Sequence, residues 1–328
     1  MQFIIADEQK KDIGFVDKNT AIDIDIGSTD DFTLSVSLSL YQAEKYKPGN
    51  YVYCIGTEYG GILDDPEIST GDHSVTFTGD TFRGMLKKKV IEPSPNQPYR
   101  IVSGELNTLI NTLVKEHFGG IFTVSGISTG VTVSNYQFYR YCTLYDGIVA
   151  MLSSVGYKLK IESKYVNDYL IIELSATPII DYSDDVEFSQ DSNIRFKIKQ
   201  YTNKYNYLLA LGKGELTERE VIYLQWNNGN IAQVNAIPKG DDVKVYLYEN
   251  SAAEELLKDS ISKFKEINTA DTYSMTIRDD VEIDIGDIVG GRDYVTGIVI
   301  AQPVTKKIIK IENKSQSISY EIGGIANG

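Results

Sequence analysis

The chain contains few of the residues on which catalysis and metal binding usually depend. Its 328 residues include two cysteines and two histidines. Cys54 and Cys142 form no Cys-x-x-Cys pair, which argues against a disulfide framework and a zinc site. His73 and His117 belong to no catalytic motif, and we expect both to be structural or solvated. The sequence therefore predicts no catalytic residue, no metal site and no cofactor, and a protein that is not an enzyme.

Long apolar runs and an excess of basic charge are also missing. No run approaches the roughly 20 apolar residues that cross a bilayer, and the N-terminal MQFIIADEQKK has no signal-peptide pattern. We therefore expect no membrane insertion and synthesis in a cytoplasm. The net charge is −14 at pH 7, which argues against a protein that grips nucleic acid through a basic surface. Two explanations of this charge stay open. It gives a soluble surface, or it forms an acidic surface that repels the phosphates of nearby DNA.

Paired carboxylates are the one catalytic device that the composition offers. Aspartate is favoured in turns because its side chain bonds to its own backbone, and each Asp-Asp pair falls in a predicted turn. A carboxylate hydrolase would need two such groups roughly 5 to 10 Å apart across a cleft. We interpret the pairs as turn residues and keep a carboxylate-based cell-wall hydrolase as the third alternative. The pairs are Asp30-Asp31, Asp64-Asp65, Asp184-Asp185, Asp241-Asp242 and Asp279-Asp280.

Two segments about 240 residues apart share one β pattern. In each, a strand of alternating apolar and polar residues leads to a turn of glycine and a polar residue, a second strand, a hairpin arm and a closing strand. The first copy runs from Phe32 to Gly79 with its turn at Gly49, and the second from Tyr273 to Gly323 with its turn at Gly286. Strict alternation predicts one buried and one exposed face. Glycines inside the arms predict bulges where a small sheet curls, at Gly61 and Gly297.

Between the two copies the apolar spacing becomes helical. An apolar stripe after Ser103 predicts a helix at 104–118, and the capping box Thr143-Leu-Tyr-Asp146 predicts another at 143–155. Strand-like sequence follows each helix, which indicates a small α/β domain. A third capping box predicts a helix at about 251–267. The fold prediction is mainly β with α+β: a first β-barrel at 1–95, an α/β insert at 96–185, and a second, similar antiparallel barrel at 186–328 that carries the 251–267 helix.

Tyrosine is in excess, with 23 residues against 11 phenylalanines. Tyrosine offers a large contact area at low entropic cost, so its clusters favour a surface for carbohydrate or protein. Tyrosines at strand edges explain the same clusters, and a carbohydrate- or receptor-binding β module is the alternative function. We interpret the short runs Lys87-Lys88-Lys89 and Lys306-Lys307 as solvated faces. The tyrosine clusters are Tyr136, Tyr139, Tyr141 and Tyr145, and Tyr201, Tyr205 and Tyr207.

The order barrel, α/β insert, barrel resembles the baseplate hub proteins of long-tailed phages and related contractile injection particles. The segment VTFTGDTFRGMLKKKVIEP, from Val75 to Pro93, and the turns PGNYVY and IGDIVGG carry the resemblance. It implies two similar barrels that assemble as a homotrimer around the tail axis and cap the tube above the central spike. Glycines stand at the matching turns of the two barrels: Gly49, Gly61 and Gly79, and Gly286, Gly297 and Gly323.

The resemblance implies a structural role in the tail baseplate of a virion that assembles in the host cytoplasm. Two like barrels in each of three chains give six like units, which lets a pseudo-sixfold ring join a sixfold tube to a threefold spike. The implied partners are the tail tube or tube-initiator protein, the central spike protein, surrounding baseplate or wedge proteins, and genome DNA that passes without specific binding. Because the chain ends at Gly328, we expect no peptidoglycan-cleaving extension. Turn acids such as Asp30, Asp31, Asp279 and Asp280 are candidates for an acidic channel wall.

Overall fold

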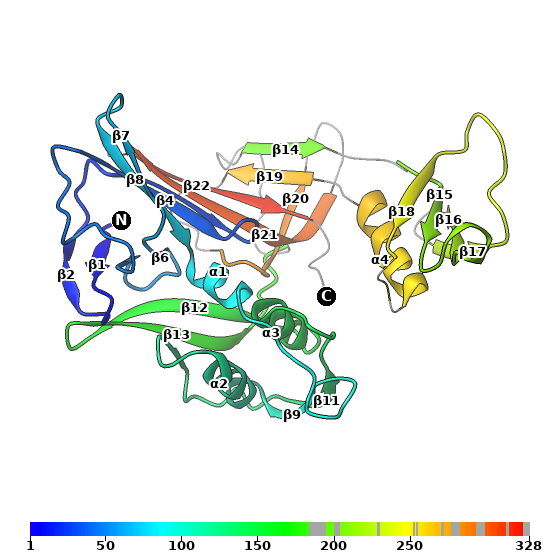
Figure 1. Cartoon of the computed structure of the whole chain (residues 1–328), viewed down its shortest axis with the longest axis horizontal. Helices are drawn as coiled ribbons and strands as arrows, with labels where there is room; N and C mark the ends of the chain where they lie inside the picture. Colours follow the sequence, from blue (N-terminus) through cyan, green and yellow to red (C-terminus); the bar gives the residue numbers. More distant parts are fainter. Residues whose placement is uncertain are drawn as a thin grey trace. The chain divides into compact units, whose positions relative to one another are not determined.

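The computed structural model is mainly β with four α-helices among the residues that it describes (Figure 1). These residues fall into two compact units. The first combines Met1–Arg195 with Met275–Ile322, and the second is Phe196–Ser274. β14 (Arg195–Lys199) and β19 (Thr272–Thr276) are the strands by which the chain enters and leaves the second unit. The described residues are 1–183, 195–199, 204–227, 230–251, 253, 255–269, 272–276, 283–292, 299–312 and 315–323.

A long antiparallel sheet in the first unit combines strands from both sequence repeats. The blue strands β3 and β4 lie beside the orange-red strands β21 and β22 (Figure 1). Ile24 of β3 is paired with Ile309 of β21 and with Phe32 of β4, and all three side chains are buried. The two repeats thus share a hydrophobic core. The spatial order is β22 (Ser315–Ile322), β21 (Val299–Glu312), β3 (Ala21–Ile26), β4 (Asp31–Ser37), β8 (Ser74–Asp80) and β7 (Pro66–Ser69), and β20 (Ile288–Arg292) also pairs with β21.

The alternating residues of this sheet behave as the sequence predicts. In β4, which lies in the predicted alternating segment, every second residue is buried, because a strand directs successive side chains to opposite faces. β3, for which the sequence analysis made no prediction, has the same pattern. Each fully buried aliphatic or aromatic side chain contributes about 1.5–3 kcal/mol relative to an exposed one. Mainly antiparallel β structure is therefore confirmed, whereas closure into two barrels stays a prediction. The buried residues are Ile22, Ile24 and Ile26 in β3, and Phe32, Leu34 and Val36 in β4.

A second sheet of the first unit has the order β2 (Asp12–Phe15), β1 (Ile4–Ala6), β5 (Tyr51–Tyr53) and β6 (Gly60–Ile62). β6 touches the end of β8 through two glycines. A Cβ atom added at Gly61 would lie 1.9 Å from the Asp80 carbonyl oxygen, and one at Gly79 would lie 1.8 Å from the Ile62 carbonyl oxygen. We predicted a bulge at Gly61, and the structure gives this glycine a different role, as a contact between two strands that leaves no room for a side chain.

The segment predicted as an α/β domain contains two helices packed on a three-stranded sheet. α2 (Leu106–His117) and α3 (Leu144–Ser153) agree with the predicted helices to within two residues. Thr143 caps α3 by accepting a hydrogen bond from the Asp146 N–H at 3.0 Å, as the capping box predicts. The sheet order is β10 (Phe122–Val124), β13 (Tyr169–Pro178) and β12 (Tyr157–Val166), and β9 (Ile101–Glu105) pairs with β11 (Thr132–Gln137).

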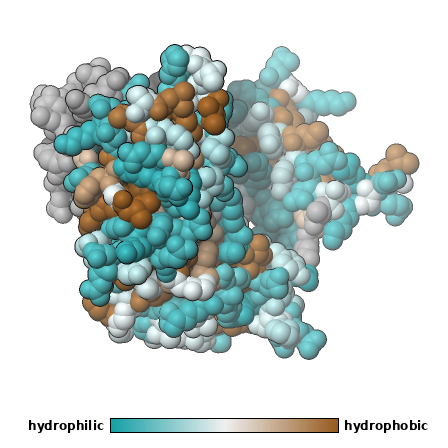
Figure 2. Space-filling model, turned by 60° about the vertical axis from the view of Figure 1, so that its left-hand side comes forward, coloured by the Kyte–Doolittle hydropathy of each residue, from teal (hydrophilic) through white to brown (hydrophobic). Residues whose placement is uncertain are grey.

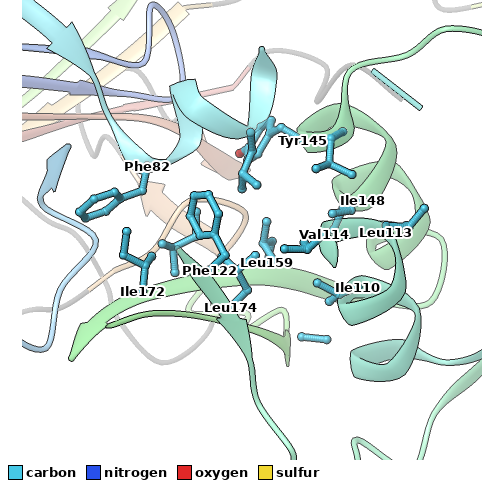
Figure 3. Packing of buried hydrophobic residues seen from close by; sticks show 14 of the residues in the cluster. Phe82, Ile110, Leu113, Val114, Phe122, Tyr145, Ile148, Leu159, Ile172 and Leu174 are labelled. Atoms are coloured by element: carbon cyan, nitrogen blue, oxygen red, sulfur yellow. The ribbon is translucent and has the colours of Figure 1, made fainter. Parts of the chain in front are cut away.

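The core of this segment extends beyond the segment itself. Phe82 of α1 (Phe82–Lys87) belongs to the same buried cluster as residues of the two helices and of the sheet (Figure 3). Ile4, Ala6 and Tyr53 of the second sheet join that cluster. We predicted an α/β domain with its own core, and this core is shared with the first repeat. The labelled members in Figure 3 include Ile110, Val114, Phe122, Ile148, Leu159, Ile172 and Leu174.

The second unit is a four-stranded sheet with one helix. α4 (Leu256–Thr269) packs on the sheet through Leu256 and Phe264, which meet Leu208, Ala210 and Leu224. We predicted this helix at about 251–267, and it begins at Leu256. None of the described helices is long and apolar enough to cross a bilayer. The strand order is β17 (Asn230–Val234), β16 (Val221–Asn227), β15 (Tyr207–Leu211) and β18 (Val245–Glu249), with the short 3₁₀ helix η2 (Leu216–Glu218) between β15 and β16.

Candidate functional site: the repeated turn and two buried ionic clusters

The glycine turn of the first repeat has a defined set of backbone hydrogen bonds. Gly49 has a φ of +91°, in the left-handed region that favours glycine. Its N–H donates to the Leu63 carbonyl at 2.8 Å, and the Leu63 N–H donates to the Asn50 carbonyl at 2.7 Å. Tyr51 then pairs with Ile62 across β5 and β6.

The glycine turn of the second repeat has the same arrangement. Gly286 has a φ of +96°, and its N–H donates to the Val304 carbonyl at 2.9 Å. The Val304 N–H donates to the Asp287 carbonyl at 2.8 Å, and Ile288 pairs with Pro303 across β20 and β21. The repeat predicted from the sequence is therefore present in the backbone at these two turns. Gly297 of the second hairpin arm lies outside the described residues.

The polar residue after each glycine is buried, but the two repeats use it differently. Asn50 is fully buried, and its side-chain amide donates to the Lys45 carbonyl at 3.0 Å. Asp287 is 1% exposed, and its Oδ1 accepts the Ile180 N–H at 2.9 Å. Its Oδ2 accepts a hydrogen bond from Lys158 Nζ at 2.6 Å. The second turn thus carries a buried negative charge that the first turn lacks.

Lys158 links the sheet of the α/β segment to this second turn. It lies in β12, is 6% exposed, and also contacts Asp284 Oδ2 at 3.1 Å. Burial raises the pKa of the Asp284 carboxyl, but the cations Lys158 and Lys307 lower it more, so the net pKa is below its ordinary value. Lys307 is also buried; its Nζ donates to the Ile283 carbonyl at 3.2 Å and lies 4.7 Å from the centre of the Tyr59 ring. These residues line a cavity of about 320 Å³.

A second ionic cluster links the α/β segment to the first repeat. Arg83 of α1 is 4% exposed; its Nε donates to Glu58 Oε2 at 2.6 Å and its Nη1 donates to the Tyr145 hydroxyl at 2.5 Å. Burial lowers the pKa of the Arg83 guanidinium, but Glu58 and Tyr145 raise it more, so Arg83 stays charged. Lys87 of the same helix forms an ion pair with Asp30. Compensated charges of this kind fix the packing of segments and supply no nucleophile or free base.

The predicted acidic pairs differ in how deeply they are buried. The Asp30 side chain is fully buried; its Oδ1 accepts the Gly27 N–H at 2.7 Å. Our prediction that Asp30 contributes to an acidic channel wall is therefore wrong, because α1 covers it and supplies its counter-ion. Asp31 is half-buried. The exposed loop residues agree with the interpretation as turn acids: Asp64, Asp65, Asp241 and Asp242. The pairs Asp184-Asp185 and Asp279-Asp280 lie outside the described residues.

The histidines and cysteines stand apart from one another. His73 is exposed in the turn of the β7–β8 hairpin, and His117 is half-buried in the last turn of α2. Burial raises the pKa of the Cys54 and Cys142 thiols. Across the described part of the chain, no three histidine, cysteine, aspartate or glutamate side chains are grouped to hold a metal ion.

The tyrosine and lysine clusters divide between surface and interior. Tyr139 and Tyr141 are 51% and 58% exposed, whereas Tyr145 is buried against Arg83. Tyr205 packs edge-on against Tyr246, and Tyr201 lies outside the described residues. The interpretation of the lysine runs as solvated faces is wrong for Lys307, which is 2% exposed, and for Lys87, which pairs with Asp30.

Sequence reasoning missed the residues that build the two ionic clusters: Lys158, Asp284, Asp287, Glu58 and Arg83. One signal was available, because Asp287 occupies the position of Asn50 in the repeat and a polar residue kept at both turns indicates a shared structural role. The pattern of β12 gave no such signal. A lysine in the alternating run YKLKI is ordinarily solvated, and only a contact from a distant segment buries it.

Comparisons with known proteins find similarity in structure and none in sequence. No family model and no curated protein matches the chain. A 43 kDa tail protein of prophage MuSo2 from Shewanella oneidensis has a TM-score of 0.56 at 13% identity, covering 98% of both chains. A tail protein from Neisseria meningitidis has a TM-score of 0.51 at 14% identity, covering 99% of this chain and 97% of the other. Prophage tail protein gp18 from Listeria monocytogenes has a TM-score of 0.50 at 12% identity, covering 100% and 96%.

These structures define the class of fold. Over nearly its full length the chain has the fold of phage tail proteins, and at this level the resemblance indicated by the sequence is confirmed.

Proposed function

We propose that the chain is a structural baseplate hub of a phage tail or phage-tail-like particle. Three copies form a pseudo-sixfold ring that joins the tail tube to the central spike and lines the DNA channel. The carrying observation is the likeness to three phage tail proteins, each matched over at least 96% of both chains. The repeated glycine turn supports the ring, because two like units per chain give six in a trimer.

The remaining features of the proposal concern domains and partners. Each repeat forms a small barrel in the division 1–95, 96–185 and 186–328. The α/β insert projects outward toward surrounding baseplate or wedge proteins. The tube or tube-initiator protein and the spike bind the two ends of the ring. DNA passes without specific binding because a chain of net charge −14 repels its phosphates.

Light scattering coupled to size exclusion, together with electron cryo-microscopy of assembled tails, tests the ring. We expect a species of about 110 kDa, three times the 36.6 kDa chain, and a threefold density at the junction of tube and spike. A chain that stays monomeric in solution and is absent from that junction in assembled tails refutes the proposal.

A carbohydrate- or receptor-binding module is the second candidate, favoured by the exposure of Tyr139 and Tyr141. A glycan array distinguishes it from the hub. Glycan binding that is lost in a Tyr139→Ala, Tyr141→Ala double variant would support the module, and the hub predicts no glycan binding by either protein.

A further inference from the structure

A groove of about 820 Å³ lies beside the N-terminus in the first unit. The Met1 α-ammonium donates to the Gln316 side chain at 3.0 Å within it. Phe15, at the end of β2, is 55% exposed and forms part of its wall. Thr20 also lines the groove; it is 3% exposed, and its hydroxyl has no hydrogen-bond partner among the described residues. The groove therefore offers an exposed aromatic ring and an unused polar atom.

The groove is basic on a strongly acidic chain. Lys18 and Lys45 line it together with the Met1 α-ammonium, and among the described residues no carboxylate lies within 4 Å of either lysine Nζ. Lys45 lies over the Tyr46 ring, 5.2 Å from its centre. Asp17 is the one acid in the lining, and its Oδ1 already accepts the Asn19 N–H at 2.8 Å. Three cations here face a single acid, although the whole chain has a net charge of −14.

The β7–β8 hairpin of the same unit has the complementary character. β7 ends the order of the large sheet, so its outer edge leaves backbone groups unpaired. Ile68 in the middle of β7 is 67% exposed. On the face that Figure 2 shows, apolar residues form separate patches among hydrophilic ones. Four exposed acids with no described ion pair surround Ile68 along the chain: Asp64, Asp65, Glu67 and Asp72.

We propose that the β7–β8 hairpin of one copy docks into the N-terminal groove of the next copy. Ile68 packs on Phe15, while Glu67 and Asp72 approach Lys18 and Lys45. The opposite charges of the two surfaces favour a second copy as the occupant, because groove against groove or hairpin against hairpin would repel. Such a head-to-tail contact uses two different patches and forms a ring when the rotation between copies is one third of a turn. The inference rests on the proposed hub function and names the surfaces that join its copies.

Charge reversal tests the contact in three variants of the full chain. The first variant, Lys18→Glu with Lys45→Glu, reverses the charge of the groove. The second, Glu67→Lys with Asp72→Lys, reverses the charge of the hairpin. The third is the four-residue variant, which combines all of these substitutions. Each two-residue variant should raise the dissociation constant of self-association roughly tenfold, because reversal removes two exposed ion pairs and replaces their attraction with repulsion. The four-residue variant should return to within about threefold of the unchanged chain. All four side chains that these variants replace are exposed or half-buried, so folding is preserved.

An equimolar mixture of the two reversed variants gives an independent result. Opposite charges then meet only between unlike chains, so pairs should form while a ring of three cannot close without one like pair. A matched control for the groove variant, Lys258→Glu with Lys265→Glu on α4, makes the same change in net charge on exposed side chains of the second unit. Analytical ultracentrifugation measures the three variants, the mixture, the control and the unchanged chain. Incorporation into assembled tails is measured for the same proteins.

The outcomes distinguish a failure of the proposed contact from a failure of the proposed ring. Loss of association in both two-residue variants with recovery in the four-residue variant supports the contact. Trimers that are equally stable in every variant, or equally weakened in the α4 control, overturn the contact and leave the proposed ring standing. A chain that forms no trimer in solution or in tails overturns the ring and the contact together.

Discussion

Replacing Asp287 by asparagine gives the second glycine turn the side chain that the first turn has at Asn50. The amide keeps an oxygen for the Ile180 N–H, but it removes the charge opposite Lys158, which is 6% exposed. Breaking a buried ion pair by removing one partner costs about 3–5 kcal/mol. Because Asp284 still faces Lys158 at 3.1 Å, we expect Asp287→Asn to lower the free energy of unfolding by about 3 kcal/mol, the lower end of that range.

Two companion variants make the measurement specific. Asp284→Asn should cost about 1 kcal/mol or less, since its side chain is 37% exposed and water replaces part of the lost interaction. Lys158→Met should cost as much as Asp287→Asn, and the double variant Lys158→Met, Asp287→Asn should cost clearly less than the sum of the two. Urea unfolding followed by circular dichroism measures the change. Trp226 fluorescence serves as an internal comparison, because the single tryptophan lies in the second unit.

A loss below about 1 kcal/mol for Asp287→Asn, or strict additivity in the double variant, would refute the reasoning. Either result would mean that buried Lys158 does not depend on Asp287 for its stability in the fold.

Three further outcomes follow from particular contacts. Gly61→Ala should destabilise the chain by about 3 kcal/mol or more because its Cβ would lie 1.9 Å from the Asp80 carbonyl oxygen, whereas Gly71→Ala, with no atom within 4 Å, should change stability by about 0.5 kcal/mol or less in thermal unfolding. Burial raises the pKa of the Glu105 carboxyl, but hydrogen bonds from Thr129 and Thr108 lower it more, to about 2. This depressed pKa stabilises the folded chain above the ordinary value of 4.5, and the contribution is lost as the pH falls from there to about 2; Glu105→Gln should lack that pH dependence in unfolding at pH 7 and pH 3. Zymograms on peptidoglycan should show no clearing, and a clearing band that disappears in an aspartate variant would contradict the structural role.

Local sequence signals predicted those parts of the fold that depend on neighbouring residues. Alternation in β4 predicted its buried face, because the two-residue period of a strand acts within the strand itself. The capping box at Thr143 gave the start of α3 for the same reason. Gly49 and Gly286 were recognised as turns, since a left-handed φ favours glycine wherever it occurs.

The missed features all depend on segments far apart in the chain. Lys158 is buried because residues 126 and 129 positions later pack on it, and nothing in its own strand indicates that cover. Asp30 has the local character of a turn acid, and the later helix α1 buries it beside Lys87. The start of α2 was assigned after Ser103, whereas Glu105 is the capping residue, because its carboxylate accepts the Thr108 N–H at 2.9 Å. Glutamate is uncommon at this position, so residue preference favoured serine.

The two ionic clusters give the α/β segment a defined position against both repeats. Tyr145 of α3 accepts a hydrogen bond from Arg83, which also pairs with Glu58 of the first repeat, and Lys158 of β12 pairs with Asp287 of the second. A buried ion pair adds little net stability over a well-packed apolar pair, but a displaced segment would leave a charge buried without its partner, at a cost of about 3–5 kcal/mol. Apolar packing alone tolerates small shifts at lower cost. We therefore expect the clusters to select one geometry of the first unit, and identical geometry in every copy is what a closed ring requires.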